Sequence, residues 1–153
     1  MRLSEVDERV LRECCASPEW AARMAALQPF VSRDALLEAA DRVLADLPED
    51  EIDRALAGHP RIGERSRNAN SAREQATVHE ADQPTLDALT RGNAAYEAKF
   101  GHVYLVCASG RSAAELLAVL EQRLGNDAAT ERQVVRTELG KINRLRLERL
   151  CPL

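Results

Sequence analysis

Aromatic residues and lysine are both scarce in this chain of 153 residues. Aromatic side chains make up only 3% of it, whereas alanine, leucine, glutamate and arginine are abundant. The abundant residues favour helices, and the scarcity of aromatic and β-branched clusters disfavours a sheet. Only Lys99 and Lys141 could form a Schiff base, and neither lies in a Gly-rich, phosphate-cradling loop. Pyridoxal and nucleotide chemistry therefore have few places in this chain.

The sequence also lacks the spacings that are typical of metal sites. Its cysteines form no CxxC pair, and His79-Glu80 lacks the second histidine of a zinc-protease motif. We interpret the cysteines as reduced thiols that pack as small apolar side chains. They are Cys14, Cys15, Cys107 and Cys151. We expect no metal and no organic cofactor, although a metal site built from the three histidines, which no spacing supports, stays as an alternative.

Neither an excess of positive charge nor a long apolar run is present. The net charge of -4 argues against nonspecific binding to nucleic acid. No apolar stretch approaches the length that spans a bilayer, and the N-terminus has no signal-peptide pattern. We therefore expect no nucleic-acid partner, no membrane association and a cytoplasmic location.

Apolar residues nevertheless make up 45% of the chain, which is enough for a folded core. They recur at helical spacing between helix-start signals such as Pro18, Pro48 and Pro84 and helix-stop signals such as Gly58 and Gly125. These patterns predict one all-α domain over residues 1–153, with about eight helices, several of them short. The one β-like run, residues 102–108, fits a strand or a buried extended connector equally well.

A polar stretch without periodicity, residues 59–75, interrupts the helical pattern. His59 lies between Gly58 and Pro60, and a following proline favours an extended backbone that can aim the imidazole into a cleft. An unperturbed imidazole pKa of about 6.5 suits proton transfer at neutral pH. The simpler interpretation is that His59 caps the carbonyl groups of the preceding helix, and for an isolated His-Pro pair we favour it.

Four residues at the end of this stretch share one helical face: Ser71, Glu74, Gln75 and Val78. Ser-x-x-Glu is also the capping-box pattern of a helix N-terminus, and spacing alone favours that interpretation. Gln75 fits it poorly, because a second amide-bearing side chain on the same face forms the row of polar groups that a ligand platform needs.

Arg146 interrupts an apolar stripe in the last predicted helix. Val135, Leu139, Ile142, Arg146 and Leu150 follow one another at steps of four, three, four and four. The spacing predicts a buried guanidinium, which needs an anion or several acceptors. A buried protein carboxylate and a carboxylate- or carbonyl-rich substrate are equally good partners. Asn93 lies in a similar stripe, so we expect it to be buried and hydrogen-bonded.

Five short motifs in this order resemble the OHCU decarboxylases, which convert 2-oxo-4-hydroxy-4-carboxy-5-ureidoimidazoline (OHCU) to (S)-allantoin and carbon dioxide in urate breakdown. The motifs are His59-Pro60-Arg61-Ile62-Gly63, Ser71-x-x-Glu74-Gln75, Lys99-Phe100-Gly101, Ala108-Ser109-Gly110-Arg111-Ser112 and Leu145-Arg146-Leu147. The resemblance extends from the N-terminal helices to Leu150. Two positions depart from the family pattern, His102 and Tyr104, and both bear on the lining of the substrate pocket.

The resemblance implies an all-α, cofactor-free and metal-free enzyme that forms a homodimer and takes OHCU as its small-molecule substrate. It implies that His59 and Glu74 are catalytic. It implies substrate contacts from Pro60, Ser71, Gln75, Val103, Tyr104, Leu105, Val106 and Arg146. Two alternatives remain: a metal-assisted hydrolase that uses the histidines, and a helical ligand-binding or regulatory module with arginine-rich surfaces.

Overall fold

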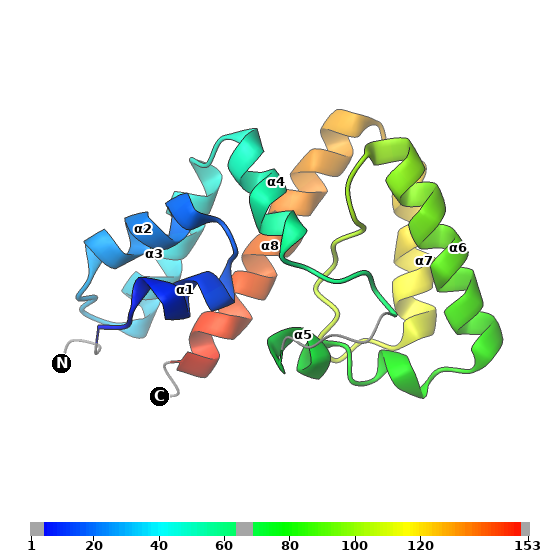
Figure 1. Ribbon diagram of the computed structural model, residues 1–153, viewed down its shortest axis with the longest axis horizontal. Helices are drawn as coiled ribbons and strands as arrows, with labels where there is room; N and C mark the ends of the chain where they lie inside the picture. Colours follow the sequence, from blue (N-terminus) through cyan, green and yellow to red (C-terminus); the bar gives the residue numbers. More distant parts are fainter. Residues whose placement is uncertain (1–4, 64–68, 151–153) are drawn as a thin grey trace. The chain divides into compact units, whose positions relative to one another are not determined.

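The structure, a computed structural model, describes residues 5–63 and 69–150, and within them it has eight α-helices, one 3₁₀ turn and no strand. The elements are α1 Glu8–Cys14, α2 Pro18–Leu27, α3 Arg33–Ala45, α4 Glu49–Ala57, α5 Ala69–Glu74, η1 Val78–Glu80, α6 Gln83–Phe100, α7 Ala113–Arg123 and α8 Ala128–Leu150 (Figure 1). The all-α prediction is confirmed. None of the described helices combines the length and apolar character that crossing a bilayer requires.

The helix boundaries follow from local capping chemistry. Ser17 precedes Pro18 and accepts a hydrogen bond from the backbone N–H of Trp20, so the start predicted for α2 is confirmed. Ser112 and Glu115 form a complete capping box at the start of α7. Helix α6 is capped at its C-terminus by Gly101, whose φ of 80° lies in the left-handed region that glycine adopts without strain.

The chain divides into two compact units. The first holds the residues up to Gly58 and those from Leu139 onward, and the second runs from His59 to Glu138. Helix α8 contributes its first half to the second unit and its second half to the first. A single domain over residues 1–153 stays a prediction.

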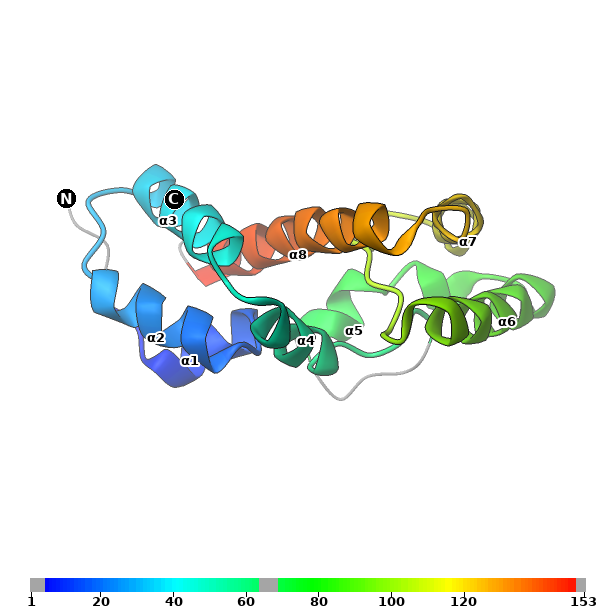
Figure 2. The same cartoon turned by 90° about the horizontal axis from the view of Figure 1, so that it is seen from above.

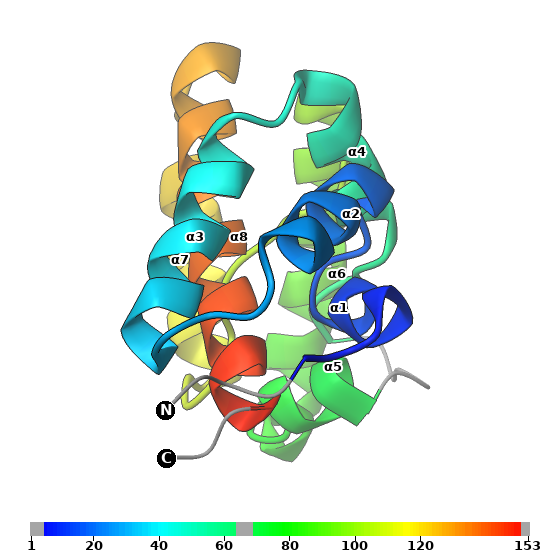
Figure 3. The same cartoon turned by 90° about the vertical axis from the view of Figure 1, so that its left-hand side faces the viewer.

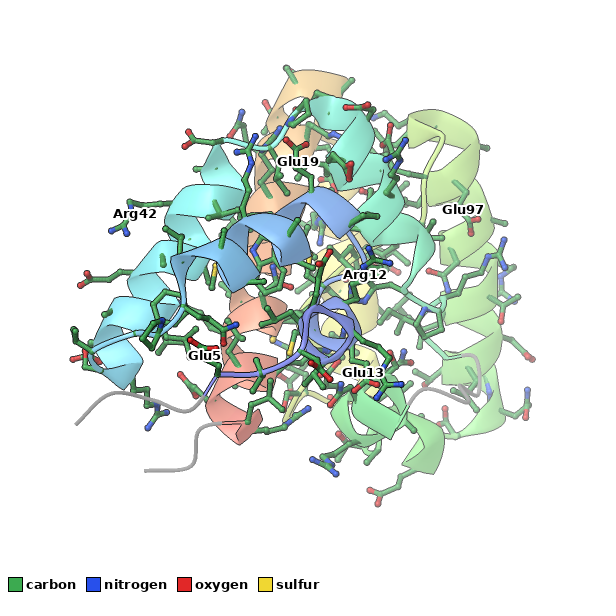
Figure 4. The ribbon with its side chains drawn as sticks, turned by 60° about the vertical axis from the view of Figure 1, so that its left-hand side comes forward. Glu5, Arg12, Glu13, Glu19, Arg42 and Glu97 are labelled. Atoms are coloured by element: carbon green, nitrogen blue, oxygen red, sulfur yellow. The ribbon has the colours of Figure 1, made fainter. Side chains whose placement is uncertain are left out.

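In the first unit, α2 packs against α1 and α3. Its Trp20 is fully buried, and the indole Nε1 donates to the carbonyl of Ala40 in α3 at 3.4 Å. Figures 2 and 3 show α3 lying along the second half of α8. Ion pairs join these two helices on their outer side, from Arg144 to Asp41 at 2.9 Å and from Arg33 to Glu148 at 3.3 Å. Arg42 points outward from α3 (Figure 4).

In the second unit, α6 packs against α7. Gly92 permits their close approach, because a Cβ atom there would lie 2.5 Å from Cδ2 of Leu120. The chain between these helices runs back past them in an extended conformation (Figure 1). The two interpretations of residues 102–108 are therefore decided in favour of the buried connector. The core of this unit consists of Ile62, Val78, Leu89, Tyr96, Tyr104, Val106, Ala108, Ala113, Leu116 and Leu120.

Candidate active site

The segment His59–Gly63 directly follows Gly58, the C-cap of α4, and His59 is half-buried. Three side chains of the second unit hold the segment after the histidine. Arg61 forms a two-pronged ion pair with Glu97 of α6, with Nε to Oε2 at 2.8 Å and Nη2 to Oε1 at 2.9 Å; Glu97 is labelled in Figure 4. The other two side chains, those of Asn93 and Gln75, form hydrogen bonds with the same peptide group. Residues 64–68 of the predicted polar loop lie outside the described residues.

This peptide group joins Ile62 to Gly63. Its carbonyl oxygen accepts a hydrogen bond from Nδ2 of Asn93 at 2.9 Å, and its N–H donates to Oε1 of Gln75 at 2.9 Å. Gly63 has a φ of 97°, a conformation that residues with a Cβ atom rarely adopt. The prediction that Asn93 is buried and hydrogen-bonded is confirmed, because only 4% of its surface is exposed.

The capping-box interpretation of Ser71 and Glu74 is wrong. Helix α5 already includes Ala69 and Asn70, so Ser71 lies inside the helix, where its carbonyl accepts from the N–H of Gln75 at 3.0 Å. Helix α5 ends at Glu74, so Gln75 and Val78 lie beyond it and the four residues do not share the face of a single helix. All four are nevertheless buried: Ser71, Glu74 and Gln75 expose 3%, 7% and 4% of their surfaces, and Val78 exposes none. A row of three buried polar side chains has to be matched by polar partners, which is the requirement of a ligand site or of a structural network.

Side chains of α7 and α8 form hydrogen bonds with main-chain groups of the connector, residues 102–108. The carbonyl of Leu105 accepts from Nη1 of Arg123 at 2.7 Å, and the N–H of Cys107 donates to Oε1 of Glu138 at 3.1 Å. The Tyr104 hydroxyl donates to the carbonyl of Leu116 at 2.9 Å. The phenol of Tyr104 therefore has a structural partner inside the second unit. Tyr104, Leu105 and Val106 are buried, and Val103 is half-buried.

Arg123 belongs to a buried ionic network that the sequence analysis missed. Its guanidinium bonds both carboxylate oxygens of Glu131, with Nε at 3.2 and 2.9 Å, and Nη2 bonds Oε2 as well. The hydroxyl of Tyr96 donates to the same carboxylate. Burial alone would raise the pKa of Glu131, but the hydrogen bonds from Arg123 and Tyr96 outweigh it and hold that pKa below its usual range.

Helical spacing could have revealed that Arg123 and Glu131 are buried. Arg123 continues the apolar series of Leu116 and Leu120, and Glu131 lies four residues before Val135 in the stripe of α8. Both are buried, as the same reasoning predicted for Arg146.

Arg146 is buried with 4% of its surface exposed, so the prediction from the apolar stripe is confirmed. It lies in the first unit, where Nη1 donates to the carbonyl of Cys14 at 3.3 Å. The neighbouring Cys15 is fully buried, and burial raises the pKa of its thiol to about 11, although the charge of Arg146 acts in the opposite direction.

Among the described residues, no group of three histidine, cysteine, aspartate or glutamate side chains could hold a metal ion. His102 packs at 5.5 Å from the ring of Tyr96 and 6.2 Å from that of Phe100. The side chain of His79 lies outside the described residues, as does Cys151. Cys15 and Cys107 are free thiols.

The structure thus brings together most of the predicted site residues within one compact unit. The His59–Gly63 segment is bonded to Gln75 after α5, and Ile62, Val78, Tyr104 and Val106 share one core. Burial raises the pKa of the Cys107 thiol, which follows the connector residue Val106, and the charges of Glu138 and Glu74 act in the same direction. Arg146 belongs to the other unit.

A comparison with solved structures defines the class of protein. The fold matches a crystal structure of OHCU decarboxylase in the presence of (S)-allantoin with a TM-score of 0.84, at 27% sequence identity. The match covers 95% of this chain and 98% of the solved one. The protein is therefore an all-helical protein with the fold of the OHCU decarboxylases.

The chain belongs to the OHCU decarboxylase family, whose family model matches residues 4–148. The 2-oxo-4-hydroxy-4-carboxy-5-ureidoimidazoline decarboxylase of Amia calva is 31% identical over 146 residues, covering 90% of this chain and 81% of that protein. The uric acid degradation bifunctional protein TTL of Arabidopsis thaliana is 32% identical over 154 residues. That match covers 95% of this chain and only 48% of the plant protein, so the chain spans about half the length of this relative.

Proposed function

We propose that the protein decarboxylates OHCU to (S)-allantoin in urate breakdown, without a metal or an organic cofactor. The observation that carries the proposal is the match to the solved OHCU decarboxylase, which extends over nearly the whole of both chains. Family membership supports the same reaction, because the family model covers residues 4–148 and therefore every motif of the resemblance.

The chemistry of OHCU explains how side chains alone can suffice. When the bond from C4 to the carboxylate breaks, carbon dioxide leaves, and the electron pair of the broken bond forms a double bond between C4 and C5. The electrons of the adjacent C=N bond move to nitrogen, which takes up a proton. The C4 hydroxyl then becomes a carbonyl, losing its proton as C5 gains one. The substrate supplies its own electron sink, the role that a pyridoxal cofactor plays in other decarboxylases.

The protein has two tasks in such a reaction. It must hold the carboxylate out of the ring plane, so that the breaking bond overlaps the π system, and it must deliver a proton to one face of C5. The second task fixes the (S) configuration of the product. An imidazole that exchanges protons near neutral pH suits proton delivery, and a guanidinium suits a carboxylate.

The proposed roles follow from the motifs and from the surroundings of each residue. His59 and Glu74 exchange protons with the substrate, and Arg146 binds its carboxylate. Pro60, Ser71 and Gln75 contact the ring and the ureido group, as does the main chain of Val103, Tyr104, Leu105 and Val106. The burial of Ser71, Glu74 and Gln75 supports a site that is shielded from water, where electrostatic contacts are stronger than at the surface.

Two further properties belong to the proposal. The family resemblance supports a homodimer, which sedimentation or light scattering would test. The free thiols of Cys15 and Cys107 are compatible with a reducing compartment and support a cytoplasmic location.

The experiment is to generate OHCU freshly from urate with urate oxidase and 5-hydroxyisourate hydrolase, and to follow carbon dioxide release with and without the protein. Acceleration above the spontaneous rate supports the proposal, and no acceleration at micromolar protein contradicts it. A sample dialysed against a strong chelator is assayed in parallel. A loss of rate that added metal restores would favour the metal-assisted alternative.

A further inference from the structure

Two buried amide side chains form hydrogen bonds with the carbonyl oxygen and the N–H of a single peptide group. Nδ2 of Asn93, in α6, donates a hydrogen bond to the Ile62 carbonyl, and Oε1 of Gln75, just after α5, accepts one from the Gly63 N–H. Both contacts measure 2.9 Å, and both side chains expose only 4% of their surfaces. A peptide group bonded at its oxygen and its nitrogen is fixed in position and in the orientation of its plane.

The gripped peptide lies three residues after His59. The intervening residues have little freedom, because the ring of Pro60 fixes its own φ angle and Arg61 is held by the paired contacts to Glu97. Ile62 is itself buried in the core of the second unit. The segment is thus anchored to α6 twice and to the end of α5 once.

From this geometry we infer that Asn93 is a positioning residue for His59, acting through the Ile62–Gly63 peptide together with Gln75. This inference rests on the proposed function, in which His59 moves a proton. It also assigns different contacts to the two ends of the Gln75 amide. Oε1 accepts the Gly63 N–H, so the proposed substrate contact is made by Nε2.

The chemistry of Asn93 makes the inference testable with one atom changed. Asn93→Asp keeps the size of the side chain, but an ionised carboxylate cannot donate to the Ile62 carbonyl and places negative charge against it. A protonated carboxyl group can donate an O–H in the same place. A carboxyl group buried at this site has a raised pKa, so protonation falls in a pH range where the protein can be assayed.

The decisive readout is the ratio of kcat for Asn93→Asp to kcat for the parent, measured between about pH 5 and pH 8. We expect the variant to be at least tenfold slower at pH 8 and the ratio to rise toward one as the pH falls, because protonation restores the donor. A ratio that does not change with pH would overturn the inference. A role confined to stability changes the amount of folded enzyme and not the kcat of the folded fraction.

Asn93→Leu and Leu120→Ala form a matched pair for the same assay. Both variants change a buried side chain of the second unit, but only the first removes the hydrogen bond to Ile62. We expect Asn93→Leu to lower kcat at least tenfold more than Leu120→Ala, with a smaller effect on KM. Equal losses of kcat in the two variants would also overturn the inference.

Hydrogen exchange of the Gly63 amide separates failure of the inference from failure of the proposed function. In the parent we expect slow exchange, because that N–H is bonded to a buried acceptor, and in Asn93→Leu we expect exchange at least tenfold faster. If the parent does not decarboxylate OHCU but shows this exchange pattern, the proposed function is wrong, while the hydrogen bonds that fix the Ile62–Gly63 peptide are supported. If the parent is active and Gly63 exchanges at the same rate in both proteins, the inference that Asn93 fixes the Ile62–Gly63 peptide is refuted.

Discussion

The ionic network of Arg123 and Glu131 offers the sharpest test of how the connector is held. Replacing Arg123 with Met leaves the carboxylate of Glu131 buried without its cation, and Glu131 has no exposed surface. Removing one partner of a buried ion pair costs about 3–5 kcal/mol. The Leu105 carbonyl also loses its donor, which costs about 1–3 kcal/mol when the acceptor stays buried. The free energy of unfolding should therefore fall by about 4–8 kcal/mol.

Urea unfolding of four proteins measures this value: the parent, Arg123→Met, Glu131→Leu and the double variant. The double variant removes both charges, so we expect it to be more stable than Arg123→Met. Arg12→Met is a matched control, because its partner Glu8 is exposed and such a pair contributes roughly 0.2–1 kcal/mol. A loss below about 1 kcal/mol for Arg123→Met would refute the account of this network.

The pH dependence of the same series has a defined sign. The pKa of Glu131 is lowered in the folded protein, despite its burial, by the hydrogen bonds from Arg123 and Tyr96. Its contribution to stability is therefore complete above the unfolded pKa of about 4.3 and is lost as the pH falls through the folded value. The stability difference between the parent and Glu131→Leu should narrow below about pH 4.

Three further predictions concern individual residues. Glu74→Gln should lower turnover by about 10²–10⁴-fold at an unchanged melting temperature, because Gln keeps the shape but cannot exchange a proton; normal turnover would remove Glu74 from the catalytic residues. Arg146→Met should weaken binding of a planar analogue such as allopurinol by roughly 1.5–3 kcal/mol in calorimetric titration, and unchanged affinity with lower stability would assign Arg146 a structural role. The Cys15 thiol, whose pKa burial raises to about 11, favours the folded state below its unfolded pKa near 8.5; the parent should therefore lose more stability than Cys15→Ala between about pH 9 and 11, and parallel pH profiles would contradict this.

Local sequence signals were sufficient for most of the helices. Pro18 and Ser112 mark helix starts through their own backbone or side-chain chemistry, so neighbouring residues determine them. The start of α5 was not predictable in this way, because residues around Ala69 are polar and show no periodicity. The error placed Ser71 at a helix N-terminus and made a capping box the preferred interpretation.

Burial was predictable for polar residues inside apolar stripes, but their partners were not. Spacing indicated that Asn93 and Arg146 are buried, yet it could not identify the acceptors at Ile62 and Cys14. The two residues of the first pair are 31 positions apart and those of the second 132. Such contacts depend on how the helices pack against one another, and the spacing of residues in a single sequence does not specify that packing. The resemblance supplied the site residues that spacing alone left open.

The optical activity of the product tests the proposed function most directly. Spontaneous decay of OHCU yields racemic allantoin, so an excess of the (S) form has to come from the protein. The account predicts (S)-allantoin in large excess with the parent, and a fall of about 10²–10⁴-fold in the stereoselective rate with His59→Asn, whose fold circular dichroism should show to be intact. Racemic product at high concentrations of the parent protein, or full stereoselectivity from His59→Asn, would contradict it.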